Sequence, residues 1–276
     1  MKMLRLLVTG CMLFLLAGCF QVTTVVRVNP DGSGTVEERV LLSKKIVAQL
    51  EEIVRSFEGD KEKGKPFDMF QPDQLKEHAR SMGKGVTYRG GEKAETPDYS
   101  GYTATYAFND INTLKLSQQS GAPAGNNESK SLPLNFSFKK GPTATLTILQ
   151  PKTETSGTAL AVPDGEPAPP ADIPPRMSDE KTKELMEMFM GMKFALAVEV
   201  NGTILSTNAT HRDGNRVTIV DFDLGKLGNA TPDELEKFSQ MKSGSLEEAK
   251  ELAKNIPGVT IDLNEKLTVV FEKGRN

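Results

Sequence analysis

The run KFALAVEVNGTILSTNATHRDGNRVTIVDFDL, residues 193–224, decides the fold that we expect from the sequence. It contains three segments rich in β-branched residues, separated by Asn201-Gly202 and by Asp213-Gly214. Both dipeptides favour the tight turns, with positive φ angles, that connect neighbouring antiparallel strands. The run therefore predicts a three-stranded antiparallel meander as the best-specified part of a sheet-based fold.

Similar patterns on both sides of this meander extend the sheet. Apolar runs flank the turn residues 29–34 and predict a hairpin over residues 22–42. Further strands are expected at 86–89, 101–108, 132–140, 143–149, 259–263 and 266–271. Helical spacing and capping residues predict helices at 43–57, 72–82, 178–192, from 231 onwards and at 245–255. The expected fold class is therefore α+β, an antiparallel sheet of hairpins and a meander packed by several helices.

Residues 151–176 are rich in proline and form the clearest low-complexity stretch of the chain. Such a composition favours extended polyproline conformations and buries little apolar surface. Because neither half of the chain shows an evident closed sheet, we expect one α+β domain over residues 19–276 that carries this stretch as an insert. The alternative is two subdomains, 19–150 and 177–276, which the stretch links.

The amino-terminal segment ends in Leu16-Ala17-Gly18-Cys19, which has the form of a lipobox. Lys2 and Arg5 supply a positive start, and the apolar run that follows is shorter than the roughly 20 residues that span a bilayer. The segment therefore predicts a lipoprotein signal peptide over residues 1–18, with lipidation at Cys19. The alternative is an ordinary secretory signal with a coincidental cysteine after it.

Similarity to bacterial lipoprotein signals implies the chemistry at this cysteine. Its thiol is alkylated with a diacylglyceryl group and its freed amine is acylated, and two or three acyl chains anchor a protein stably. Phe20 follows the cysteine. By resemblance to the sorting pattern of diderm lipoproteins, this residue favours the outer membrane. We therefore expect a lipid-anchored protein of the bacterial envelope, on the outer membrane and facing the periplasm.

Charge and cysteine content exclude several classes of protein. The chain has a formal net charge of −3, and loss of Lys2 and Arg5 with the signal peptide makes it −5. A mildly acidic chain lacks the positive surface that binds nucleic acid. Its two cysteines are Cys11, which leaves with the signal peptide, and Cys19, so we expect no disulfide in the mature chain.

Motifs for catalysis or metal binding are not evident in the sequence. The two histidines, His78 and His211, accompany no hydrolase or metalloprotease motif, although Asp213 is close enough in sequence to contact His211. Asp221 and Asp223 alternate with apolar residues, which places both on the solvent face of a strand or, alternatively, around a hard cation. We therefore predict no catalytic residue, no cofactor and no metal site.

Methionines recur at alternate positions in the helix expected over 178–192, at Met186, Met188, Met190 and Met192. Together with Phe189 they cover more of the helix surface than a single buried stripe requires. Three interpretations are open: a core or docking face, a soft groove for an apolar ligand, and a thioether site for Cu(I). These five residues are our candidate ligand-binding surface.

Three segments point to one family: Val26-Arg27-Val28 leading into Asp31-Gly32-Ser33-Gly34, residues 101–108, and residues 197–224. They resemble LppM-like bacterial lipoproteins, which are envelope proteins of poorly defined function. The resemblance implies a lipid-anchored α+β domain with a prominent antiparallel sheet, able to accept an apolar or lipid-like ligand, and it brings no catalytic residue. The chain differs from mycobacterial-type members in its proline-rich insert and in showing no carboxy-terminal transmembrane helix.

These observations predict a non-enzymatic lipoprotein of the bacterial envelope, attached to the membrane through its lipid anchor. We expect its domain to bind an apolar or lipid-like ligand or another envelope protein. One alternative is an envelope hydrolase that acts at the wall or the membrane. Another is a copper-handling protein that uses the methionine-rich helix.

Overall fold

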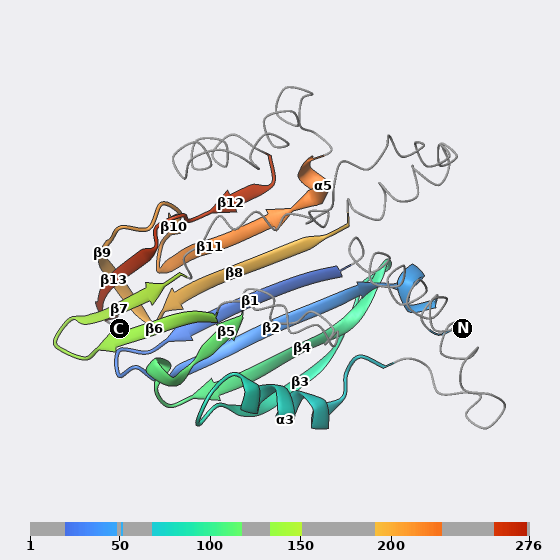
Figure 1. Ribbon diagram of the computed structural model, residues 1–276, viewed down its shortest axis with the longest axis horizontal. Coiled ribbons are helices and arrows are strands. Elements are labelled where there is room, and N and C mark those ends of the chain that lie inside the picture. The colour runs from blue at the N-terminus through green and yellow to red at the C-terminus, as the bar shows by residue number, and fades with distance from the viewer. Residues whose placement is uncertain are drawn as a thin grey trace, which may run out of the picture.

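The computed structural model of the chain describes residues 20–48, 51, 68–117, 133–150, 191–227 and 257–274. Strands predominate in this part of the chain and form an eight-stranded sheet, sheet A, and a five-stranded sheet, sheet B (Figure 1). The strands are β1 (Phe20–Val28), β2 (Gly34–Ser43), β3 (Thr87–Glu95), β4 (Tyr99–Phe108), β5 (Lys115–Ser117), β6 (Pro133–Lys139), β7 (Ala144–Leu149), β8 (Lys193–Val200), β9 (Gly202–Thr207), β10 (Arg212–Asp213), β11 (Arg216–Asp223), β12 (Val259–Ile261) and β13 (Lys266–Lys273).

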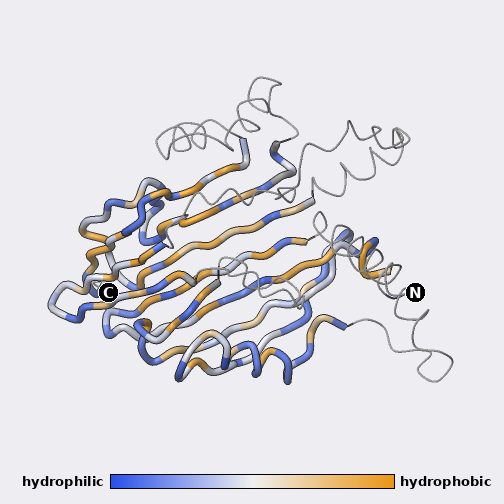
Figure 2. Tube along the Cα trace, viewed as in Figure 1, coloured by the Kyte–Doolittle hydropathy of each residue, from blue (hydrophilic) through white to orange (hydrophobic). Residues whose placement is uncertain are grey.

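Sheet A has the strand order β10-β11-β8-β1-β2-β4-β3, and β12 pairs with another part of β11. Strand β1 lies at its centre, where it pairs antiparallel with β2 and parallel with β8. The central position follows from the sequence of β1, because Val22, Val26 and Val28 are β-branched and are fully buried on one face. Figure 2 shows that hydrophobic residues concentrate along β1, β2 and β8, whereas the edge strand β3 is largely hydrophilic.

Sheet B has the strand order β5-β6-β7-β13-β9 and lies over the end of sheet A at which β1 ends and β2 begins (Figure 1). Its buried side chains, such as Leu146 and Val269, form one core with Val26 and Val36 of sheet A. The packing is close, because a Cβ on Gly32 in the β1–β2 turn would lie 2.8 Å from the Phe138 ring. We call the face of sheet A that meets sheet B its inner face, and the opposite one its outer face.

Strands from both sides of the proline-rich stretch take part in both sheets. In sheet A they meet in the parallel pair β1–β8, and in sheet B they meet in the antiparallel pair β7–β13. Residues 1–18 and the insert 151–176 themselves lie outside the described residues.

The expected α+β class is wrong, because the described chain is β-rich and its sheets pack mainly on each other. Its helices are α3 (Pro72–Ser81), which confirms the helix expected at 72–82, and the four-residue α5 (Leu224–Leu227). A 3-10 turn, η2, covers Ile111–Thr113, and residues 44–48 are helical. Of the helix expected at 178–192 only residues 191 and 192 are described, and neither is helical, so a helix there does not extend to 192. The helices expected after 231 and at 245–255 lie outside the described residues. The expected single sheet divides into two layers, since the apolar faces of its strands bury one another.

The predicted meander is wrong at Asn201-Gly202, where β9 leaves sheet A and pairs with β13 in sheet B. The Asn201 amide donates to the Val28 carbonyl at 2.8 Å and so prolongs the β1–β8 ladder. A tight hairpin turn at this dipeptide needs positive φ, and the glycines with positive φ do not include Gly202. Gly202 permits close packing instead, because a Cβ there would lie 2.0 Å from the Glu272 carbonyl oxygen.

Three predicted turns are confirmed. Residues 29–34 join β1 to β2, with Gly32 at a φ of 88°. The Gly141-Pro142 turn joins β6 to β7, which pair antiparallel. Asp213-Gly214 joins β10 to β11, with Gly214 at a φ of 57°, although only the two residues of β10 pair there and not the strand expected at 203–211, much of which is β9 in sheet B. In each case the local turn chemistry predicted the pairing of the strands that follow one another directly.

A fully buried carboxylate, Asp262, ties the loops of the two sheets together. Its Oδ2 accepts from the Thr210 amide at 2.7 Å, in the connection from β9 to β10. Its Oδ1 accepts from the Asn264 amide at 3.0 Å and from Asn264 Nδ2 at 2.7 Å, in the connection from β12 to β13. The Asp262 amide itself donates to the Ile219 carbonyl of β11 at 2.8 Å. Because these donors satisfy the carboxylate, it is stable in the interior without a cation.

Candidate functional site

The sequence-predicted site residues fall into two groups. The lipidation residue and most of the candidate ligand-binding surface lie outside the described residues; they are Cys19, Met186, Met188, Phe189 and Met190. Met192 is described: it directly precedes β8, is not helical and is half-buried. The histidines and the aspartates around residues 213–223 are described. The structure can therefore be compared with the second group and, in the first, with Met192 alone.

His211 and Asp213 do not form a catalytic pair. The His211 carbonyl oxygen accepts from the Thr218 amide at 3.0 Å. Asp213 lies on the exposed strand β10, and among the described residues no hydrogen bond joins its carboxylate to His211. The arrangement required for the hydrolase alternative is therefore not assembled by these two residues.

Asp221 and Asp223 lie together on the outer face of sheet A, as predicted, and both are half-buried. The Asp223 carboxylate lies 3.8 Å from Lys193 Nζ and 3.9 Å from Lys226 Nζ. Oδ1 of Asp221 is buried and has no hydrogen-bond partner in the described part of the chain. That part contains no group of three or more His, Cys, Asp or Glu residues placed to hold a metal ion.

The structure instead shows a polar group that sequence reasoning missed. Glu38, in the middle of β2, is fully buried on the inner face of sheet A. Helix α3 covers this part of the sheet through Leu75 and Ala79, which are also buried. From the same helix His78 extends to Glu38, with 3.1 Å between His78 Nε2 and Glu38 Oε2. We call these two residues, together with Tyr88, Tyr102 and Tyr106, the Glu38 cluster.

Three tyrosines from β3 and β4 surround the acid and the imidazole. The Tyr106 ring packs edge-on against the His78 ring, with 5.6 Å between the ring centres. The Tyr88 ring packs on Tyr106 with 5.9 Å between the ring centres. Burial raises the pKa of the Tyr102 and Tyr106 hydroxyls, and the negative charge of Glu38 adds to the effect. Both hydroxyls therefore remain protonated at neutral pH. The Tyr106 hydroxyl is buried without a hydrogen bond of normal geometry among the described residues.

The charge of His78 depends on Glu38. Burial by itself opposes the protonated imidazole, but the hydrogen bond and the charge of Glu38 outweigh it and raise the pKa of His78 above its usual value. The His78 side chain is 29% exposed, so protons reach it from solvent, whereas Glu38 is shielded. The pair therefore fastens α3 to β2 by an ionic contact that depends on pH.

The position of Glu38 had a detectable signal in the sequence. Strand alternation places Glu38 on the same face as Val36 and Val40, two residues that a core would bury. Its partner was not detectable, because His78 lies 40 residues further along the chain. An acidic residue among alternating apolar residues therefore predicts a buried charge, but it does not identify the residue that neutralises that charge.

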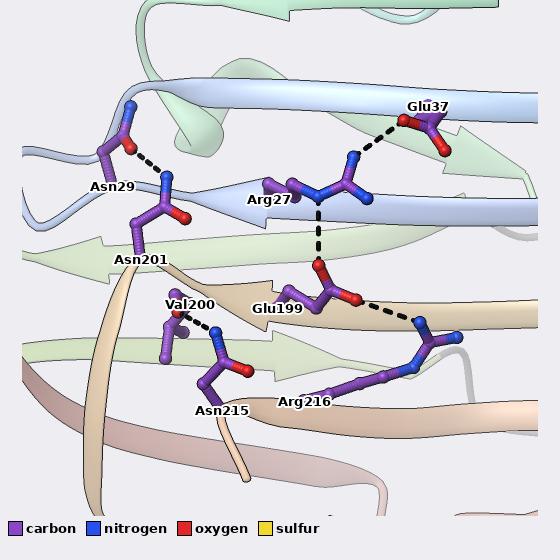
Figure 3. A network of polar contacts seen from close by, with 8 residues as sticks. All are labelled: Arg27, Asn29, Glu37, Glu199, Val200, Asn201, Asn215 and Arg216. Carbon is purple, nitrogen blue, oxygen red and sulfur yellow. Dashed lines mark hydrogen bonds and ion pairs between the residues drawn. The ribbon is translucent and has the colours of Figure 1, made fainter. Parts of the chain in front are cut away.

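A second polar network crosses the outer face of sheet A (Figure 3). Arg27 of β1 binds Glu37 of β2 at 2.9 Å and Glu199 of β8 at 3.0 Å. Arg216 of β11 binds the other oxygen of Glu199 at 2.9 Å. Alternating charges on four neighbouring strands thus pair across the sheet. At their end of the sheet the side chains of Asn29 and Asn201 also form a hydrogen bond.

Comparisons with known proteins give little further identification. No model of a protein family and no curated protein matches the chain. Among solved structures, the chain is similar to the NMR structure of the folded domain of LppM from Mycobacterium tuberculosis. The match covers 94% of this chain and 92% of that one, with 13% sequence identity and a TM-score of 0.31. A TM-score this low supports no conclusion about fold or function. In the described residues no helix is long and apolar enough to cross a membrane.

Proposed function

We propose that this chain is a lipid-anchored protein of the bacterial envelope, held on the outer membrane, that binds a ligand or partner and is not an enzyme. The observation that carries the proposal is the lipobox Leu16-Ala17-Gly18-Cys19, which closes a short apolar segment with a positive start. Strand β1 starts at Phe20, the residue directly after the lipobox cysteine Cys19. Cleavage before Cys19 leaves strand β1 intact.

The inner face of sheet A supports an apolar or lipid-like ligand. Strand register places Phe222, Phe194, Val22 and Val40 in one row across β11, β8, β1 and β2. This row lies towards the start of β1, away from the end that sheet B covers (Figure 1). The two valines are buried, whereas both phenylalanines are partly exposed. Neighbouring, partly exposed aromatic side chains offer an apolar contact surface.

Replacing Cys19 by alanine is expected to abolish incorporation of a fatty-acid analogue and to prevent stable membrane anchoring. The physical reason is the loss of the acyl chains, each buried methylene of which contributes about 0.8 kcal/mol to membrane binding. Metabolic labelling and membrane fractionation measure both effects. Cys11→Ala is the matched control, because Cys11 lies within the predicted signal peptide and should leave labelling unchanged. Label that persists in Cys19→Ala contradicts the anchor.

The ligand is tested on an unanchored form that carries an ordinary secretory signal in place of residues 1–18 and serine at Cys19. Without an anchor it can be purified free of detergent, so extracted lipids are not carried over with the acyl chains. We expect mass spectrometry of an organic extract to reveal a co-purifying apolar molecule. Phe222→Asp should lose this molecule, while Arg39→Ala on the outer face should keep it. An empty extract from the unsubstituted form contradicts ligand binding.

A further inference from the structure

The position of the anchor relative to the sheet restricts how the domain meets the bilayer. Phe20 is the first residue of β1, and it pairs with Leu42 of β2, while Gln21 pairs with Lys193 of β8. A single residue spans at most about 3.6 Å of extended chain. If Cys19 is lipidated, as the proposed function requires, the start of the central strand therefore lies directly beside the lipid headgroups.

The residues at this end of sheet A suit a headgroup layer. We call it the Phe20 end; its described cations are Lys44, Lys45, Lys193 and Lys226, and the acids Glu95, Asp98 and Asp223 lie among them. Phe20 and Tyr99, both partly buried, also lie at this end. The pairs that Lys44 forms with Glu95 and Lys226 with Asp223 are long, at 3.9 Å each, and the two lysine side chains are 45% and 61% exposed. Exposed lysines can extend to phosphate groups, and aromatic rings favour the interface between water and hydrocarbon.

Neither face of sheet A is suited to lie flat on lipid. The outer face carries the paired charges of Arg27, Glu37, Glu199 and Arg216, which lipid contact would desolvate (Figure 3). The inner face is covered by sheet B at one end and by α3 beside the Glu38 cluster, so its partly exposed row of Phe194 and Phe222 is confined to the part next to the Phe20 end (Figure 1). Contact through the Phe20 end avoids both costs.

We propose that the Phe20 end of sheet A is a membrane-contact surface and that the domain stands end-on on the bilayer. The partner is the anionic headgroup layer into which the lipid anchor inserts. Strand β1 has nine residues, so at about 3.3 Å per residue it places the turn at 29–33 roughly 30 Å from the headgroups. Sheet B, at that far end, then faces the surrounding compartment, and the row of Phe222 and Phe194 lies near the headgroups.

Single cysteines carrying an environment-sensitive fluorophore test this orientation in the full lipidated protein. If Cys11 leaves with the signal peptide and the Cys19 thiol is alkylated, each introduced cysteine is the only free thiol. The proximal labels are Lys45→Cys and Lys226→Cys, the outer-face label is Arg39→Cys, and the distal label is Lys140→Cys beside the β6–β7 turn. All four side chains are exposed. The protein is reconstituted into vesicles of phosphatidylethanolamine and phosphatidylglycerol that contain lipids with nitroxide-labelled headgroups.

We expect strong loss of fluorescence at both proximal labels, weaker loss at Arg39→Cys, which pairs with Thr23 about 10 Å along β1, and none at Lys140→Cys. Quenching of Arg39→Cys as strong as that of Lys45→Cys would mean that the sheet lies flat, and it overturns the proposal. Quenching at Lys140→Cys, or at no position in protein that floats with the vesicles, overturns it as well. Protein that does not float with the vesicles at all counts against the anchor, and hence against the proposed function itself. Flotation is therefore measured first.

Discussion

Replacing His78 by alanine is expected to lower the free energy of unfolding by about 3–5 kcal/mol at pH 6, because it leaves a buried charge unpaired. The Glu38 carboxylate is fully buried, and His78 is its hydrogen-bonded cation at 3.1 Å. Urea unfolding followed by circular dichroism measures the change. A loss of less than about 1 kcal/mol, the range of surface ion pairs, would contradict a buried ionic contact.

The double substitution separates the charge from the packing of α3. Glu38→Gln keeps the size of the side chain and removes its charge, so His78→Ala should cost much less in that background than in the natural sequence. Arg80→Ala is the matched control on the same helix, since Arg80 contacts Glu77 in solvent and both side chains are largely exposed. If His78→Ala is equally costly with glutamine at position 38, the ring contact with Tyr106 and not the charge accounts for the loss.

The pH dependence of stability follows from the same pair. The pKa of His78 is raised by folding, so its contribution is complete below the unfolded value, about 6.5, and declines as pH rises through the folded value. Three aspartates with lowered pKa values change protonation only below this pH range; they are Asp31, Asp68 and Asp73. Tyr102 and Tyr106, whose pKa values are raised, change protonation only above it. Stability should therefore fall from pH 6 to pH 9 in the natural protein, and Glu38→Gln should flatten that slope.

Local turn chemistry predicted the strand pairs that are close in sequence. The residues around Gly32, Gly141 and Gly214 bring their own flanking strands together, so pattern alone was sufficient to pair them. The dipeptide Asn201-Gly202 has the same chemistry but a different outcome. There Asn201 extends the ladder with β1 and Gly202 accommodates the backbone of β13, and both partners are distant in sequence.

The features that the sequence did not predict depend on contacts between segments far apart in the chain. The parallel pairing of β1 with β8 joins residues about 170 positions apart, and no local pattern selects it. Division of the strands into two sheets depends in the same way on which apolar faces meet. The Glu38 cluster depends on a local pattern and on a distant contact. Alternation along β2 indicated a buried acid, but its partner His78 comes from a helix that packs on the sheet only in the folded chain.

Replacing Asp262 by alanine is expected to lower the free energy of unfolding by about 3–5 kcal/mol, because hydrogen bonds to a charged group contribute about 1.5–3 kcal/mol each. Its carboxylate accepts from the Thr210 and Asn264 amides and from Asn264 Nδ2. Alanine leaves the two backbone amides without these acceptors and loosens the connections from β9 to β10 and from β12 to β13. Urea unfolding measures the loss, with the slope against denaturant expected to stay unchanged.

The effect should lie in the carboxylate and not in the loop as such. Asn264→Ala keeps the backbone amide that donates to Asp262 and removes Nδ2, which donates to the Asp262 carboxylate and to the Asn208 carbonyl at 3.1 Å. It should cost about 1.5–3 kcal/mol, the value of a hydrogen bond to a charged group, and less than Asp262→Ala. Asp262→Asn keeps the shape of the side chain, but one of the two acceptor oxygens becomes an amino group that faces an amide donor. The loss of unfolding free energy for Asp262→Asn should therefore fall between those for Asn264→Ala and Asp262→Ala. Equal costs for all three substitutions would show that Asp262 is no more than one contact among several. A graded series would identify it as the buried acceptor that holds the loops of both sheets in register.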